Sequence, residues 1–80
     1  MKLITVYDTK AQAHLMVATV RTSAEGIRQF ESECKNSSSQ FYKHPNDFVL
    51  KEIASYDEIT AEIIPIIPHN ILCTASDFKE

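Results

Sequence analysis

The sequence predicts an α+β domain in which one helix packs on a four-stranded antiparallel sheet, with the element order β-β-α-β-β. Two observations lead to this fold class. Four stretches are rich in β-branched, aliphatic and aromatic residues, and one stretch of helical periodicity stands between the second and the third of them. The length of 80 residues predicts one domain, residues 1–80, and the hydrophobic content of 44% is typical of a packed domain.

The first two strands are predicted over residues 3–7 and 13–20. Between them, Asp8-Thr9-Lys10 supplies polar turn residues. The second stretch is largely apolar on both faces, with His14, Met16, Ala18 and Val20 on one of them. A strand of this kind is expected to lie in the centre of the sheet, or to have its outer face covered by another chain.

The helix is predicted over residues 23–35. Thr22 as N-cap can accept a hydrogen bond from the backbone N–H of Glu25, and the Glu25 side chain can reach back to the cap. An apolar stripe follows at spacings of three and four, formed by Ala24, Ile27, Phe30 and Cys34. Gly26 inside this helix costs about 1 kcal/mol relative to alanine, so we expect it to permit close packing. The polar run Asn36-Ser37-Ser38-Ser39 ends the helix.

The third and fourth strands are predicted over residues 47–56 and 61–67, joined by a polar turn at Asp57-Glu58. Pro65 cannot donate a hydrogen bond to a neighbouring strand, so the fourth strand should lie at a sheet edge or be broken there. Pro68-His69-Asn70 is predicted to form another turn, followed by a short extended end over residues 71–75.

The net charge of −3 weighs against nucleic-acid binding, but the charge is unevenly distributed. Residues 1–51 hold seven cations and five acids, whereas residues 52–80 hold one cation and six acids. Such asymmetry can create a binding face and a repelling face on one small body. The alternative is an ordinary solvated surface that happens to be lopsided.

The sequence indicates an intracellular protein without a membrane partner. No segment approaches the roughly 20 apolar residues of a membrane span, because the richest run, residues 63–71, contains Pro65 and Pro68. The N-terminus lacks the apolar block and the cleavage site of a signal peptide. In that compartment Cys34 and Cys73 are expected to remain reduced thiols.

No residue pattern indicates an enzyme. A chain with one glycine cannot build a glycine-rich phosphate loop, and His14, His44 and His69 share no ligand-like spacing with one another or with a cysteine. A site that joins a cysteine to a histidine is disfavoured, since nothing indicates the electropositive surroundings that activate a thiol. We therefore expect no catalytic residue, no metal site and no cofactor.

Four consecutive residues give the best signal for binding: Phe41, Tyr42, Lys43 and His44. At least two of their side chains should face solvent. A base can stack on an exposed ring while an ammonium holds a phosphate, which is how many single-stranded nucleic acids are bound. The alternative is structural: Phe41 packs in the core, Tyr42 covers its edge, and His44 caps the turn before Pro45.

Arg28 and Lys35 are further candidates for binding. They lie seven residues apart on the predicted outer face of the helix, so they can extend a phosphate track. The alternative is a solvated helix surface alongside Glu31.

Several short motifs follow one another along nearly the whole chain: Val6-Tyr7-Asp8-Thr9-Lys10-Ala11, Ile27-Arg28-Gln29-Phe30, Phe41-Tyr42-Lys43-His44-Pro45-Asn46-Asp47-Phe48, Tyr56-Asp57 and Ala75-Ser76-Asp77-Phe78. In their order and spacing they resemble the small nonstructural protein, often called DNA-binding protein, of gokushoviruses. These are microviruses, phages with single-stranded DNA genomes.

The resemblance implies a non-enzymatic phage protein of the host cytoplasm that binds single-stranded DNA and regulates the switch from genome replication to packaging. It supplies no binding residues, so the candidates remain those found above: Arg28, Lys35, Phe41, Tyr42, Lys43 and His44. The alternative is a protein-interaction module that contacts replication or capsid proteins without touching DNA. The net acidity and the apolar strands favour that alternative.

A homodimer is also expected. A chain of this size builds only a modest core, and one helix shields only one side of a four-stranded sheet. A two-fold partner can cover the second apolar surface or pair with a free strand edge. The alternative is a monomer in which residues 71–78 fold back over the open face.

Overall fold

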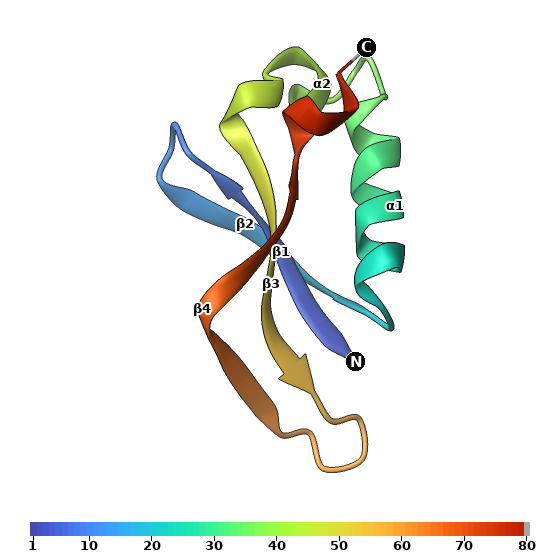
Figure 1. Cartoon of the computed structure of the whole chain (residues 1–80), viewed down its shortest axis with the longest axis vertical. Coiled ribbons are helices and arrows are strands. Elements are labelled where there is room, and N and C mark those ends of the chain that lie inside the picture. The colour runs from blue at the N-terminus through green and yellow to red at the C-terminus, as the bar shows by residue number, and fades with distance from the viewer. Residues whose placement is uncertain (80) are drawn as a thin grey trace.

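The computed structural model describes residues 1–79 as a four-stranded antiparallel sheet with its helices on one side (Figure 1). Its elements are β1 (Lys2–Asp8), β2 (Ala13–Val20), α1 (Ser23–Cys34), α2 (Gln40–Lys43), η1 (Pro45–Asp47), β3 (Phe48–Tyr56), β4 (Ile63–Thr74) and η2 (Ala75–Phe78). The strand order is β2-β1-β3-β4. The predicted α+β class, with one main helix on this sheet, is therefore confirmed.

The start of α1 follows from its capping residues. The Thr22 hydroxyl accepts a hydrogen bond from the Glu25 N–H at 3.1 Å, as predicted. The Glu25 carboxylate accepts instead from the backbone N–H of Arg21, at 3.3 Å. A Cβ on Gly26 would lie 3.0 Å from Cδ1 of Ile4, so the missing side chain is what allows the helix to approach β1 this closely.

The core lies between α1 and the sheet. Its buried members are Ile4, Val20, Phe30, Cys34, Phe48, Leu50 and Ala75. Ala24, predicted for the core stripe of the helix, is exposed. Aromatic rings close one end of the core: the centroids of Phe30 and Phe41 lie 5.3 Å apart, and those of Phe41 and Phe48 lie 4.7 Å apart. Phe78 meets Phe30 at 6.3 Å, which anchors η2 to this end.

β2 is an edge strand, so its predicted central position is wrong. Seven of its eight residues are exposed. A bulge sets Leu15 and Met16 opposite Val6, and it also breaks the predicted alternation along the strand. As a result, His14 lies on the open face beside Tyr7, whereas Met16 lines a groove beside α1. The composition could not show this, because a bulge changes the face of a side chain without any change in residue type.

β4 runs without a break through both of its prolines, so the predicted turn at Pro68-His69-Asn70 is wrong. The pairing with β3 is irregular there, because residues 66–69 stand opposite the single residue Ile53. The predicted edge position of this strand is confirmed. An edge strand tolerates Pro65, since it needs hydrogen bonds on one side only.

The C-terminal segment leaves the open face of the sheet uncovered. Residues 71–74 continue β4, and η2 then packs against α1 at the aromatic end of the core (Figure 1). The predicted fold-back of residues 71–78 over the open face is therefore wrong.

The β3–β4 hairpin extends past the helix-covered body as an arm, residues 56–67 (Figure 1). Four of its large apolar side chains are exposed, those of Ile59, Ile63, Ile64 and Ile67, whereas Ile66 is half-buried. The turn at its tip is held by Asp57, whose carboxylate accepts from the backbone N–H groups of Ile59 and Thr60; these hydrogen bonds lower the pKa of Asp57.

In the part of the chain that the structure describes, no helix has the length and apolar character needed to span a membrane.

Candidate nucleic-acid interface

One side chain from each strand contributes to a cluster on the open face of the sheet. We call Tyr7, His14, Lys51 and His69 the open-face cluster. The Lys51 ammonium lies 4.3 Å from the centroid of the Tyr7 ring and 3.3 Å from Nε2 of His14. The ring centroids of Tyr7 and His14 are 4.6 Å apart. The face thus holds a cation in contact with two rings, and a third ring, His69, stands edge-on to His14.

Two side chains from opposite edges of the sheet approach each other on this face. β2 and β4 are its opposite edges, yet the ring centroids of His14 and His69 are only 6.1 Å apart. Four strands laid flat would span roughly 14 Å at the usual spacing of about 4.8 Å. The His14 and His69 side chains therefore lean toward each other across the open face.

The cluster sets the protonation of His14. Partial desolvation, followed by the charges of Lys51 and His69, lowers the pKa of His14 below its ordinary value of 6.5. The imidazole is therefore neutral at pH 7. Since an ammonium can only donate, Nε2 of His14 accepts from Lys51 and the ring proton sits on Nδ1.

The strand register extends the cluster into two cross-strand rows. One row is Val17, Thr5, Lys51 and Ile71, and the other is His14, Tyr7, Val49 and Thr74. These eight residues include no carboxylate. The negative charge of the chain therefore lies outside these rows, and the rows themselves combine apolar side chains, rings and one permanent cation.

Such a surface can bind an unpaired nucleic-acid strand. Bases stack on tyrosine and histidine rings, and lysine neutralises phosphates. An open antiparallel sheet face suits this task, because aromatic side chains from neighbouring strands stand side by side and unpaired bases can stack on them.

The sequence-predicted candidates lie on the helix side of the molecule. Phe41 packs between Phe30 and Phe48, so the core-packing alternative describes it and its ring is not free to stack on a base. Arg28 is exposed on α1. Lys43 is exposed on α2.

His44 follows α2 directly, and its side chain caps nothing. Its backbone carbonyl instead accepts from the N–H of Asp47 at 3.1 Å. The predicted cap before Pro45 is therefore made by the backbone, and the imidazole is exposed.

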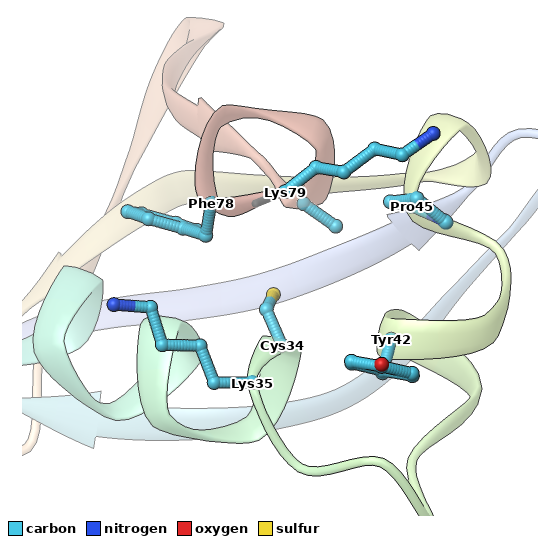
Figure 2. A pocket seen from close by; sticks show the side chains of 7 residues that line it. Cys34, Lys35, Tyr42, Pro45, Phe78 and Lys79 are labelled. Carbon is cyan, nitrogen blue, oxygen red and sulfur yellow. The ribbon is translucent and has the colours of Figure 1, made fainter.

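Two of the predicted residues, Lys35 and Tyr42, do come together. They line a pocket of about 360 Å³ between the end of α1, α2 and η2, which we call the Tyr42 pocket (Figure 2). Its other lining residues are Cys34, Pro45, Ala75, Phe78 and Lys79. Tyr42 is 53% exposed, so its ring is accessible. The Lys35 ammonium is 2.9 Å from the Glu31 carboxylate, as the helix-surface alternative anticipated.

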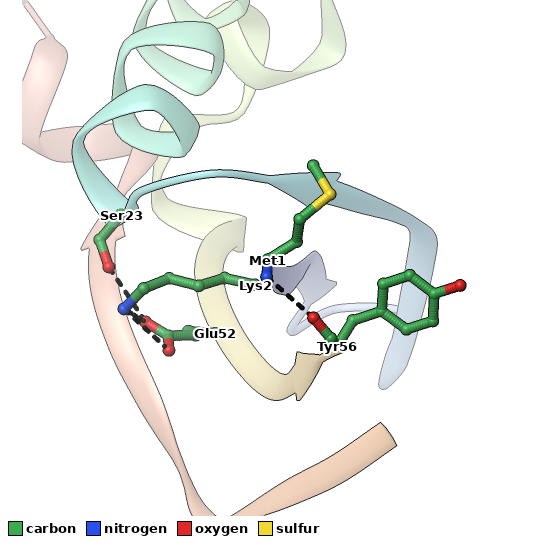
Figure 3. Close-up of polar contacts among 5 residues, drawn as sticks. All are labelled: Met1, Lys2, Ser23, Glu52 and Tyr56. Carbon is green, nitrogen blue, oxygen red and sulfur yellow. Dashed lines mark hydrogen bonds and ion pairs between the residues drawn. The ribbon is translucent and has the colours of Figure 1, made fainter. Parts of the chain in front are cut away.

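The buried carboxylate of the sheet, Glu52, has a structural role. It lies 3.3 Å from Nζ of Lys2 and accepts from the Ser23 hydroxyl at 3.0 Å (Figure 3). Beside it, the Met1 ammonium donates to the Tyr56 carbonyl at 2.8 Å. These bonds tie β1, β3 and the first turn of α1 together, and they leave Glu52 fully partnered.

The thiols and the possible metal ligands form no further site in the described chain. Burial raises the pKa of both Cys34 and Cys73 to about 11, which is opposite to the shift that activates a nucleophilic cysteine. Among residues 1–79, no three histidine, cysteine or acidic side chains are placed to hold a metal ion together.

Sequence reasoning missed the open-face cluster because its members are far apart in the chain. Tyr7 and Lys51 could have been found as outward positions of the first and third predicted strands. His14 reaches this face only beside the bulge of β2, and His69 was predicted to lie in a turn. No local pattern predicts either histidine.

A family model described as Phage ORF5 protein matches residues 1–78 of the chain. No curated protein and no solved structure matches it.

Proposed function

This chain belongs to the phage ORF5 protein family, and from that premise we propose that it binds single-stranded DNA across the open face of its sheet. We further propose that it is a gokushovirus protein of the host cytoplasm whose binding regulates the switch from genome replication to packaging. No catalytic step and no cofactor belong to this proposal.

The open-face cluster is the observation that supports the proposal. It places the His14 ring between those of Tyr7 and His69 and sets Lys51 beside Tyr7 and His14. Tyr7, His14 and Lys51 lie on rows without a carboxylate. The rings favour an unpaired strand, because the bases of a duplex are already stacked and cannot reach them.

Each member of the cluster has a role in the proposal. A base stacks on Tyr7 or on one of the two histidines, and Lys51 turns from His14 toward a phosphate. That exchange replaces a neutral acceptor by a charged one, so the ammonium gains the attraction of the phosphate charge. The phosphate would also favour protonation of His14, so binding should strengthen as the pH falls.

Fluorescence anisotropy with a labelled oligonucleotide tests the proposal. Tyr7→Ala should weaken binding by about 1–3 kcal/mol for each stacked base that is lost. Lys51→Gln should weaken binding and reduce the slope of log affinity against log salt by about 0.7, the contribution of one phosphate on a single strand.

The matched controls lie on the helix side. Tyr42→Ala removes an equally large ring from the Tyr42 pocket, and the double variant Arg28→Glu with Lys43→Glu reverses two exposed charges. Both controls should retain most of the affinity. Loss of binding in these variants, with Tyr7→Ala unaffected, would move the site to the helix side. Absence of binding by the unmodified chain at low salt would end the proposal.

The second candidate function is a protein-interaction module that contacts a replication or capsid protein. The exposed isoleucines of the arm favour it, since surfaces of this kind commonly mark protein contacts. Salt separates the two functions: DNA binding weakens steeply as salt rises, whereas an apolar protein contact does not.

A further inference from the structure

The two edges of the sheet differ in their protection against pairing with another chain. β4 contains Pro65 and Pro68, and its pairing is irregular around them. β2 contains neither a proline nor a charged residue over Ala13–Val20. Prolines and charges are the usual means by which an edge strand avoids a partner, so β2 is the less protected edge.

An apolar groove of about 220 Å³ runs beside β2, between the strand and α1. Core residues Ile4, Phe30 and Leu50 contribute to its lining, so α1 leaves part of the core accessible along this edge. Met16 stands at the rim of the groove and is 87% exposed. A flexible apolar side chain and an apolar groove therefore lie next to each other on the same edge.

We propose that a second copy of this chain pairs along β2, and that Met16 of each copy enters the groove of the other. A two-fold axis beside β2 brings the same surface of both copies together, so each copy supplies one Met16 and one groove. The contact is self-complementary, and it needs no change in the fold of either copy.

Charge favours this contact over a two-fold contact through the arms. The arm carries Asp57, Glu58 and Glu62. In a two-fold contact through the arms, these acids would face the same acids of the second copy, and the like charges would repel. β2 brings no charge to the contact, and Glu33 is the one acid that lines the groove. An acidic or basic partner would find no countercharge on β2, whereas a second copy requires none.

The bulge sets the extent of the pairing. The Thr5 hydroxyl lies 3.2 Å from the carbonyl oxygens of both Leu15 and Met16, which turns these two groups toward β1. The regular free edge is therefore Val17 to Val20, short for a strand contact. Burial of Met16 and Val17 must supply much of the stability.

Pairing at β2 would join the two sheets into one of eight strands with both open faces on the same side. Two open-face clusters would then lie on one continuous surface. The dimer itself does not depend on DNA binding, and its test uses no DNA.

Sedimentation equilibrium of the full chain at micromolar concentration provides the test. The unmodified chain should sediment as a species of twice the 9.1 kDa chain mass. Met16→Glu should sediment at the chain mass, because the carboxylate would have to enter an apolar groove. Met16 is almost fully exposed in the single chain, so this variant should fold normally.

Ile67→Glu is the matched control, since Ile67 is 86% exposed on the opposite edge strand. It should retain the dimer mass. A monomeric unmodified chain, or dissociation by Ile67→Glu with Met16→Glu still dimeric, would overturn the proposal.

Amide hydrogen exchange at two protein concentrations gives a second readout. Protection of Val17 to Val20 should increase with concentration, whereas protection of residues 63–67 in the arm should not change. Concentration-dependent protection confined to the arm would contradict pairing at β2.

Discussion

The two faces of β3 perform different tasks within one strand. Phe48, Leu50 and Glu52 point toward α1 and are buried, whereas Val49, Lys51 and Ile53 alternate with them toward the open face. In the described chain, every buried side-chain polar atom has a hydrogen-bond partner. The open face holds a partly exposed cation over a ring. The helix face is thus committed to stability, and the open face remains available for a ligand.

A substitution on the buried face should have the largest effect on stability. Leu50 is 2% exposed at the centre of the core, so Leu50→Ala should reduce the free energy of unfolding by about 2–5 kcal/mol. Lys51→Ala, one residue along on the other face, loses the contact with the Tyr7 ring and should reduce it by about 0.5–1 kcal/mol. Urea denaturation of both variants measures the contrast. Equal losses would mean that the open face is also part of the core.

Loss of the buried carboxylate should have an intermediate effect. Glu52→Gln weakens the contacts to Lys2 and Ser23 and should cost about 1–3 kcal/mol in the free energy of unfolding. The control is Glu31→Gln, which removes the exposed pair with Lys35 and should cost less than about 1 kcal/mol. The same denaturation experiment compares the two. An unchanged free energy of unfolding in Glu52→Gln would show that this carboxylate is dispensable for the fold.

The smallest effect is expected at His14 and depends on pH. The pKa of His14 in the folded chain lies below the 6.5 of the unfolded chain, so the unfolded chain takes up the proton first. Stability should therefore fall slightly as the pH drops below 6.5. Titration of the imidazole by NMR measures the pKa directly, and Lys51→Gln should raise it. An unchanged value in that variant would mean that Lys51 does not act on His14.

Short sequence patterns predicted the helix and the strands well, but they did not predict how the strands are arranged relative to one another. The start of α1 followed from Thr22 and Glu25, which act within one turn of each other. The edge position of the last strand followed from Pro65 alone. The exposure of β2 did not follow, because the same apolar composition suits a central strand and an edge strand that awaits a partner.

The candidate site was less predictable for the same reason. Tyr42 and Lys35 were chosen for their local sequence and do share a pocket, but the rings and the cation of the open face come from four strands. Their meeting depends on the strand order and on the register of the strands around the bulge of β2. Neither property is encoded in any short stretch of residues.

The lysine above Tyr7 also has an optical consequence. The chain has three tyrosines and no tryptophan, so its ultraviolet emission comes from phenol rings alone. Tyr7 emits from beneath an ammonium and beside an imidazole, whereas Tyr42 emits from a half-open pocket. Each of the two competing faces thus contains its own chromophore. A chain in which Tyr56 and one of these two tyrosines are replaced by phenylalanine reports on the other face without any attached dye.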